Sequence, residues 1–344
     1  MHGCYNDSMA DPSAAASDSL ERRLAAVRQW GDFTQAYSTA TQAGLDHFWH
    51  DRGYLAYQRK WRIACVLGDP VAPPELVEPL LRAFLRQFRK TCYWQISRPT
   101  ADALARLGFW VNEMGVDTRL DLVGYDFNGK RKERLRHAGN WLSKHGFMVR
   151  EASFHVGSER VDLDQIRALS ERWLASRRIR GTVRFFNRPI AFIDEPDVRK
   201  FFLFDPHGAC VAFVFFDPIY RDGQVVGYSP AIKRRAADAP LRAEEGIMKA
   251  AIEQFQREGR ERVMLGLSPL AGIEDREFKP NPLMHFSWSR GMNAWWINRF
   301  FYNLRGHADF KRRFDGREEQ TYFASDALFN DLRVIATLRL AGVL

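Results

Sequence analysis

The segment FFLFDPHGACVAFVFF, from Phe201 to Phe216, is the stretch that says most about the fold. Its two apolar runs, Phe201 to Phe204 and Cys210 to Phe216, predict two buried strands with a polar turn between them. Toward the C-terminus the pattern continues as a strand, a polar loop, a helix and another strand, with the three regular elements at Gln224 to Tyr228, Glu244 to Glu258 and Val263 to Leu267. This order is typical of a mixed α/β unit.

The first half of the chain repeats the order of strand, strand, loop, helix and strand. The predicted elements are a helix from Leu20 to Trp30, a second helical set at Leu45 to Trp49, strands at Tyr54 to Tyr57 and Arg62 to Leu67, a helix from Pro74 to Phe88, a strand at Cys92 to Ile96 and a helix at Ala101 to Leu107. The repeat lies in pattern and hardly in residue identity, and it predicts a duplicated unit.

Predicted domain bounds follow from this repeat. We expect a disordered leader at 1–19, an N-terminal unit at 20–126, a basic connecting helix and linker at 127–182, and a C-terminal unit at 183–344. The final segment, 328–344, carries apolar residues with arginines between them, so it either closes the core or lies in a membrane interface. The aromatic stretch 182–196 either lines an acceptor channel or packs between the units, and we prefer packing.

Composition and charge limit the class of protein. With 344 residues and 46% hydrophobic content, the chain can bury a large core. Its net charge of +9 points to a partner that carries phosphate, such as RNA, an anionic membrane surface or a phosphorylated small molecule. Charge alone does not choose among these partners.

Four scattered cysteines give neither a disulfide framework nor a zinc site, so we expect reduced thiols and no metal. No apolar run reaches the roughly 20 residues that span a bilayer, and no signal-peptide core precedes the folded part. These observations predict a cytoplasmic protein without a transmembrane segment, for which peripheral contact with the inner face of an anionic membrane stays open.

Two stretches concentrate cationic groups. One lies between the halves and carries a run of basic residues, at Lys130, Arg131, Lys132, Arg134 and Arg136, which is either a solvated face or a surface that binds the phosphates of tRNA. The other, from Phe300 to Phe323, places Tyr302, Asn303 and Arg305 before a helical turn with Lys311 and ends near Glu319. Cations between aromatic anchors suit an anion-receiving site, although a solvated basic helix has the same pattern.

Five motifs, from about Asp46 to Ala324, together resemble one family in order and spacing. They are LGDPV (Leu67 to Val71), FNGKRKERLRHAGNWLSKHGF (Phe127 to Phe147), LSERWLASRRIRG (Leu169 to Gly181), LGLSPL (Leu265 to Leu270) and YNLRGHADFKRRF (Tyr302 to Phe314). The family is that of the cytoplasmic C-terminal domains of phosphatidylglycerol lysyltransferases, the multiple peptide resistance factors, which are aminoacyl-tRNA-dependent enzymes that modify lipids.

The resemblance implies a mixed α/β fold of two tandem GNAT-like units joined by the basic helix, with catalysis in the second unit. It implies an acyltransferase that moves an amino acid from aminoacyl-tRNA, its co-substrate, to a hydroxyl or amine, with no other cofactor. By position, Asn303, Arg305, Lys311 and Glu319 fall on the family's polar motif, and Ser268 falls on the strand-end motif that faces it.

Direct attack on the tRNA ester needs a held nucleophile, a base and oxyanion donors, without a covalent enzyme intermediate. Lys311 and Arg305 are candidates for binding tRNA phosphates or the oxyanion. Glu319 is a candidate for proton transfer or for orienting the amine, with a surface ion pair as the alternative. His285 is a candidate general base, with a satisfied core histidine as the alternative. Tyr302 joins Ser268 as a candidate substrate-binding residue.

The identity of both substrates stays open. Arg234 and Arg235 follow Lys233 in the segment Ser229 to Pro240, and a cationic lining there would repel a lysyl side chain. We therefore expect a neutral or acidic aminoacyl group. The acceptor is a lipid headgroup in the first place, with a sterol, a small alcohol or the amine of a peptide or natural product as alternatives.

Two other classes compete with this reading. An acyl-CoA-dependent GNAT N-acyltransferase would hold pyrophosphate at a Gly-rich helix start, but the segment Ile232 to Gly246 lacks paired glycines and carries acidic Glu244 and Glu245. A non-catalytic protein that binds RNA or a membrane surface is the second alternative.

Overall fold

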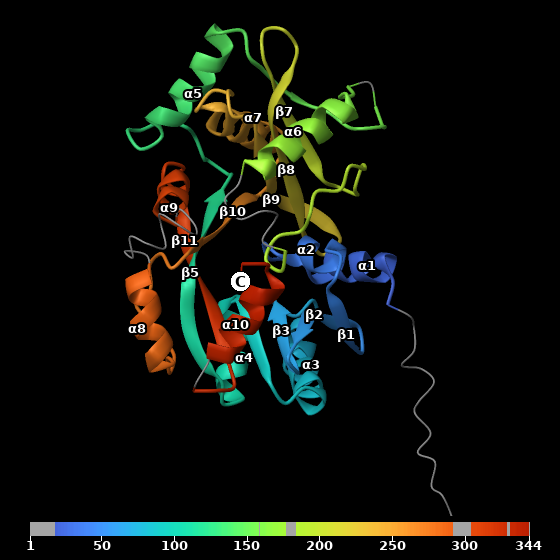
Figure 1. The fold of residues 1–344 in the computed structure, drawn as a ribbon, viewed down its shortest axis with the longest axis vertical. Helices are drawn as coiled ribbons and strands as arrows, with labels where there is room; N and C mark the ends of the chain where they lie inside the picture. The colour runs from blue at the N-terminus through green and yellow to red at the C-terminus, as the bar shows by residue number, and fades with distance from the viewer. Residues whose placement is uncertain (1–17, 158, 177–183, 292–303, 329–330, 344) are drawn as a thin grey trace, which may run out of the picture.

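The computed structural model describes residues 18–157, 159–176, 184–291, 304–328 and 331–343 (Figure 1). Their strands are β1 (Asp46–His50), β2 (Gly53–Lys60), β3 (Ile63–Leu67), β4 (Thr91–Ile96), β5 (Trp110–Asp121), β6 (Met148–Glu151), β7 (Arg199–Phe204), β8 (Cys210–Arg221), β9 (Gln224–Arg235), β10 (Arg262–Pro269) and β11 (Arg317–Ser325). Their helices are α1 (Leu20–Trp30), α2 (Ala36–Thr41), α3 (Pro74–Gln87), α4 (Arg98–Arg106), α5 (Glu133–Lys144), α6 (Leu163–Ala175), α7 (Ala243–Arg257), α8 (Pro282–Gly291), α9 (Leu304–Arg312) and α10 (Asp331–Leu340).

One mixed sheet joins both halves of the chain, in the order β1-β2-β3-β4-β11-β5-β10-β9-β8-β7-β6. In Figure 1 the first strands lie in the lower part with α3 and α4, and β7 and β8 lie in the upper part with α5 to α7. β11, from the C-terminal end, is inserted between β4 and β5 of the first half. The predicted fold class, mixed α/β, is confirmed, and the division into two GNAT-like units with its exact bounds stays a prediction.

Most predicted elements are present, and two differences have local causes. The set predicted as a helix at Leu45 to Trp49 is instead strand β1, because a two-residue turn at Asp51 and Arg52, with Asp51 at φ 53°, pairs His50 with Gly53 in a hairpin. The loop predicted after Tyr228 is still strand, since β9 stays paired with β8 as far as Arg235.

Local sequence explains several helix starts. Ser19 caps α1 by accepting a hydrogen bond from the Arg22 amide, so the folded chain has already begun at the end of the predicted leader. Residues 1–17 lie outside the described residues. Pro74 opens α3, where its missing N–H costs nothing, and Asp162 caps α6. The basic stretch predicted to connect the units forms a loop and then α5, which packs on α7.

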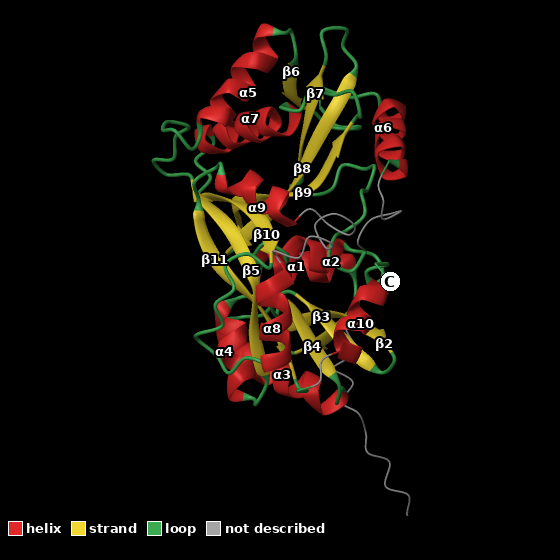
Figure 2. Ribbon diagram, turned by 60° about the vertical axis from the view of Figure 1, so that its left-hand side comes forward, coloured by secondary structure: helices red, strands yellow, loops and turns green. Residues whose placement is uncertain are grey.

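Helices cover both faces of the sheet (Figure 2). One cluster packs α5 and α7 on the strands of the second half, and another packs α3 and α4 on those of the first. A third cluster spans both halves and includes Phe185, with Phe186 and Phe192 packed against it, which confirms the preferred packing role of that aromatic stretch. α10 also closes the core, since Ala336 and Thr337 are fully buried while Leu332 faces out.

Candidate active site

The strands β9 and β10 separate from one another in the middle of the sheet. The two strands pair in parallel only at Arg262 and Val263 of β10. On its other edge, β10 shifts register against β5 between Met264 and Leu267. Gly266 lies in this bulge at φ 82°, a conformation that favours glycine. The bulge turns two carbonyl groups of β10 out of the regular ladder.

Lys311 of α9 binds these two carbonyls. Its Nζ donates to the oxygens of Gly266 and Leu267, both at 2.6 Å, and the residue is only 6% exposed. Burial lowers the pKa of the Lys311 amine to about 7, although the charges of Asp117 and Glu244 work in the opposite direction. A neutral amine has two hydrogens, which the two carbonyls engage, and one lone pair that can accept a proton.

The cationic residues of β9 do not form one lining. Lys233 makes an ion pair with Glu244 of α7 at 2.8 Å and lies over the ring of Phe310 in α9. Arg234 points to the opposite face, where its guanidinium lies 4.0 Å from the centre of the Trp173 ring. Part of the predicted lining is therefore missing, because Lys233 is paired and Arg234 faces away, while Arg235 stays on the face of Lys233. The preference against a lysyl donor stays a prediction.

Asp117 of β5 belongs to the same region. It is 4% exposed and accepts a hydrogen bond from the Thr34 hydroxyl at 2.6 Å. Burial raises the pKa of the Asp117 carboxyl, against the opposing effects of the Lys311 charge and the Thr34 hydroxyl. Asp117 and Lys311 therefore interact electrostatically across the bulge, and the charge of each shifts the pKa of the other.

Other predicted site residues take different places. Ser268 is buried in β10, directly after Leu267, and Arg235 shares the face of Lys233. Arg305 is exposed on the first turn of α9. Glu319, on β11, lies 2.7 Å from Arg317 in a surface ion pair. Asn303 and Tyr302 lie outside the described residues.

His285 sits on α8 with a buried carboxylate behind it. Its Nδ1 lies 2.7 Å from Asp275 Oδ2, and Asp275 also accepts hydrogen bonds from the Asn112 side chain and the Glu113 amide. This pairing orients the imidazole and leaves its other nitrogen for a partner. The pair is anchored at the start of β5, several residues from the position of Asp117 on the same strand.

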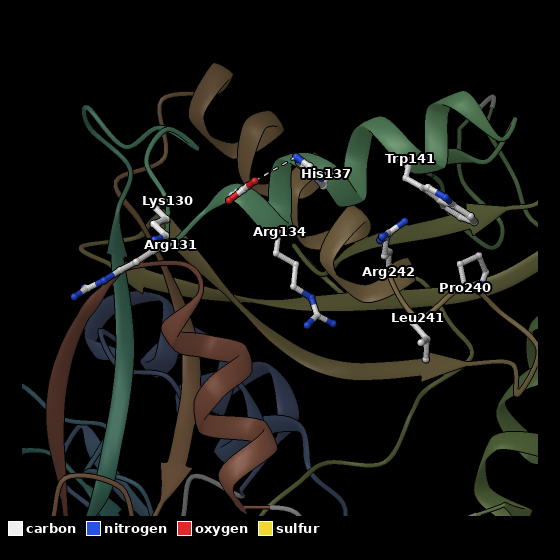
Figure 3. Close-up of a pocket in the computed structure, with 9 residues that line it drawn as sticks. Lys130, Arg131, Arg134, His137, Trp141, Pro240, Leu241 and Arg242 are labelled. Carbon is white, nitrogen blue, oxygen red and sulfur yellow. Dashed lines mark ion pairs between the residues drawn. The ribbon is translucent and has the colours of Figure 1, made fainter.

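A cationic groove of about 660 Å³ lies between α5 and the loop before α7 (Figure 3). Lys130, Arg131 and Arg134 line it, as does Trp141, whose ring centre is 5.4 Å from the Arg242 guanidinium. Arg131 also pairs with Asp315 at 2.6 Å, which links the groove to the turn after α9. Cations beside an aromatic ring are suited to a phosphate chain with bases.

The other two residues of the predicted RNA-binding run support the loop that leads into α5. The Lys132 amine donates to the Asp126 carbonyl at 2.7 Å, and the Arg136 guanidinium donates to the Gly129 carbonyl at 2.9 Å. These contacts hold the backbone in place, so Lys132 and Arg136 shape the groove while the others line it.

Sequence reasoning did not single out several residues that the fold brings to these sites. The sequence pattern does not point to Asp117 or Asp275, and it assigns Trp141 to no site. The one available signal was the strand Trp110–Asp121, whose buried polar residues at 112, 113, 117 and 118 are unusual for a central strand. Within the described residues there is no cluster of metal-ligating side chains and no helix long and apolar enough to cross a bilayer.

Several known proteins are similar to this chain in sequence or in structure. The phosphatidylglycerol lysyltransferase of Bacillus subtilis strain 168 is 25% identical over 283 residues, which cover 78% of this chain but only 30% of that protein. Among solved structures, L-PGS from Bacillus licheniformis has a TM-score of 0.76 at 18% identity, covering 94% of this chain and 97% of that one. The C-terminal domain of an Agrobacterium fabrum protein named as a lysylphosphatidylglycerol synthetase has a TM-score of 0.70 at 20% identity, covering 94% and 95%.

The similarity to these solved structures shows that the fold is shared. The family model for the C-terminal region of phosphatidylglycerol lysyltransferase matches residues 24–325, which is most of the chain. The match includes β10 with its bulge, α9 with Lys311 and both sides of the cationic groove. The chain therefore belongs to the family of phosphatidylglycerol lysyltransferase C-terminal domains.

Proposed function

We propose that this chain transfers an aminoacyl group from aminoacyl-tRNA to a hydroxyl of phosphatidylglycerol, by direct attack. The observation that carries the proposal is the buried Lys311 amine at the β10 bulge, with its pKa lowered to about 7. Membership of a family named for a lipid aminoacyl transfer supports the reaction type. The Bacillus subtilis relative is a longer protein, of which the alignment covers 30%, so the donor and the acceptor are part of the proposal.

The chemistry needs one base and no covalent intermediate. The acceptor hydroxyl attacks the ester carbonyl carbon of the aminoacyl-tRNA while its proton passes to the neutral Nζ of Lys311. The tetrahedral intermediate then collapses, the bond to the ribose oxygen breaks, and Lys311 returns the proton to that oxygen. The two backbone carbonyls hold the amine in place throughout, so its lone pair is preorganised for the transfer.

The cationic groove is proposed to bind the tRNA end. Lys130 and Arg131 are exposed cations for phosphates, and the Trp141 ring, which stacks on His145 at 3.9 Å, forms the aromatic side of the groove. Arg131 connects the groove through Asp315 to the turn that follows α9, which carries Lys311. A tRNA end held in this groove therefore lies on the side of the molecule from which α9 approaches the bulge.

A donor and acceptor scan tests the proposal. Purified protein receives total tRNA charged in turn with each labelled amino acid, and phosphatidylglycerol in detergent micelles serves as acceptor, with phosphatidylethanolamine as the comparison lipid. We expect label to enter phosphatidylglycerol from one or a few charged tRNAs. The signal should be lost in Lys311→Met and kept in Lys249→Met, a lysine of α7 that pairs with Glu253.

Two results would contradict the proposal. One is the absence of lipid label from every charged tRNA by folded protein. The other is release of free CoA from an acyl-CoA donor with an amine acceptor, which would identify the chain as an acyl-CoA-dependent transferase.

A further inference from the structure

Asp117 is a buried carboxylate, and one of its two oxygens accepts a hydrogen bond. Its Oδ2 accepts the Thr34 hydroxyl, whereas its Oδ1 is covered from solvent and makes no hydrogen bond of ordinary geometry within the described part of the chain. The nearby Gly266 amide N–H lowers the pKa of this carboxyl without completing Oδ1. Buried polar atoms are nearly always paired, and a carboxylate oxygen without a donor is costly. An oxygen in this state, beside the proposed catalytic amine, indicates that a donor from a ligand completes it.

The position of Asp117 fits a ligand at the bulge. In the register of β5 and β10, Asp117 lies opposite Leu267, whose carbonyl binds Lys311. Its neighbour Val116 packs with Ala308 of α9, so successive side chains place Asp117 on the other face of the strand, toward Thr34. Lys311 and Asp117 thus approach the bulge from two sides, and no direct ion pair joins them although each affects the pKa of the other.

The ligand group that matches this environment is a cation with several N–H donors. Every aminoacyl ester carries an α-ammonium on the carbon next to its carbonyl, whatever its side chain. If the attacked carbonyl lies at Lys311, the α-ammonium is a few bonds further on, which suits a carboxylate close to Lys311 but unpaired with it. A neutral hydroxyl would satisfy Oδ1 without compensating the buried charge.

We propose that Asp117 binds the α-ammonium of the aminoacyl group and so positions the ester carbonyl for attack. This inference rests on the proposed function. It assigns recognition of the feature that all aminoacyl donors share, and it leaves the choice of side chain to other residues. Thr34 orients the carboxylate by holding Oδ2, which turns Oδ1 toward the donor.

The test compares two donors that differ only at the α-nitrogen. The best aminoacyl-tRNA from the donor scan is used as such and after α-acetylation, which removes the positive charge and leaves any side-chain amine in place. Transfer to phosphatidylglycerol is measured as kcat/KM for wild type, Asp117→Asn and Asp121→Asn. Asp121 lies on the same strand, exposed and paired with Arg119, and makes a matched control.

Wild type and Asp121→Asn should prefer the free amine. Asp117→Asn should lower kcat/KM for the free-amine donor about 10- to 100-fold, the range of one charge-assisted hydrogen bond, and leave the acetylated donor unchanged, so that the preference disappears. Should Asp117→Asn fail to fold, Asp117→Glu, which keeps the charge and displaces it by one methylene, is compared with wild type in the same way.

Equal losses with both donors would overturn the assignment, because a merely structural role affects every donor alike. The assignment would also be overturned if the Asp117 variants kept the wild-type preference for the free-amine donor over the acetylated donor. The same holds if that preference changed only for donors that carry a side-chain amine. No product from either donor with wild type would instead overturn the proposed function, and the assignment with it.

Discussion

Lys233 and Glu244 form an ion pair of 2.8 Å on the face of the sheet from which Lys311 reaches the bulge. The two charges act on the Lys311 amine with opposite sign, since Glu244 raises its pKa and Lys233 lowers it. The pair therefore adjusts the proton affinity of the proposed base, in addition to neutralising a cation in the site.

Removing either charge should move the pH dependence of transfer in opposite directions. In Glu244→Gln the pKa of Lys311 falls further, so the amine becomes neutral at a lower pH and the rise of the rate with pH shifts to lower pH. In Lys233→Met the pKa of Lys311 rises, and the rise of the rate shifts to higher pH. Single-turnover rates measured across neutral pH check this. Shifts of the same sign in both variants would contradict the assignment.

The buried cation Arg188 is expected to stabilise the whole fold. It binds Asp217 and Glu195, with both carboxylates largely buried, and so ties the segment after residue 184 to β8. Arg188→Met leaves two unpaired buried carboxylates, which should lower the free energy of unfolding by about 3–5 kcal/mol. Arg221→Met breaks only partly exposed pairs with Asp32 and Glu261 and should cost about 1 kcal/mol or less. Urea unfolding of both variants checks the difference, and equal losses would contradict it.

Alanine substitutions of two glycines at the contact between α5 and α7 should change the stability of the protein in opposite directions. A Cβ at Gly246 would meet Leu142 Cδ1 at 2.1 Å, so Gly246→Ala overpacks the contact and should destabilise by about 1–3 kcal/mol. A Cβ at Gly139 would meet only the flexible side chain of Lys249, at 3.2 Å. Gly139→Ala should therefore gain part of the roughly 1 kcal/mol of helix propensity. Thermal unfolding measures both, and stabilisation by Gly246→Ala would refute the packing described here.

The cationic groove should bind tRNA with a strong dependence on salt. Lys130→Ala and Arg242→Ala should each weaken binding and reduce the slope of log K against log salt by about 1, as expected for one lost phosphate contact. Arg86→Ala is the control, because Arg86 is exposed on α3 in the other half of the molecule. Filter binding at several salt concentrations gives the slopes. The same slope in all three variants would place the tRNA elsewhere.

Much of the fold could be predicted from local patterns. The strands around Phe201 and the helix that Pro74 opens follow from apolar runs and from proline chemistry, which are local signals. The insertion of β11 between β4 and β5 could not be predicted, since it pairs residues about 200 positions apart. Pairing at that distance leaves no periodic signal in the sequence.

The candidate site was predictable only in part. Lys311 was identified from a cationic motif, but its role depends on two carbonyls that a bulge at Gly266 exposes, and bulges depend on strand register. Asp117 is harder to predict, because the polar residues of β5 resemble those of an exposed strand until the fold shows that several of them are buried. Adjacency in the sequence predicts one lining for Lys233 and Arg234, whereas strand geometry places neighbouring residues on opposite faces.

The most direct measurement is the single-turnover rate of aminoacyl transfer to phosphatidylglycerol against pH, for wild type and Lys311→Met with saturating charged tRNA. The wild-type rate should rise with pH through about 7 and then level off, as the Lys311 amine loses its proton. In Lys311→Met the rate should fall about 10²- to 10⁴-fold and lose this pH dependence, while tRNA binding stays intact. A variant that transfers at nearly the wild-type rate, with the same pH profile, would show that Lys311 is not the base.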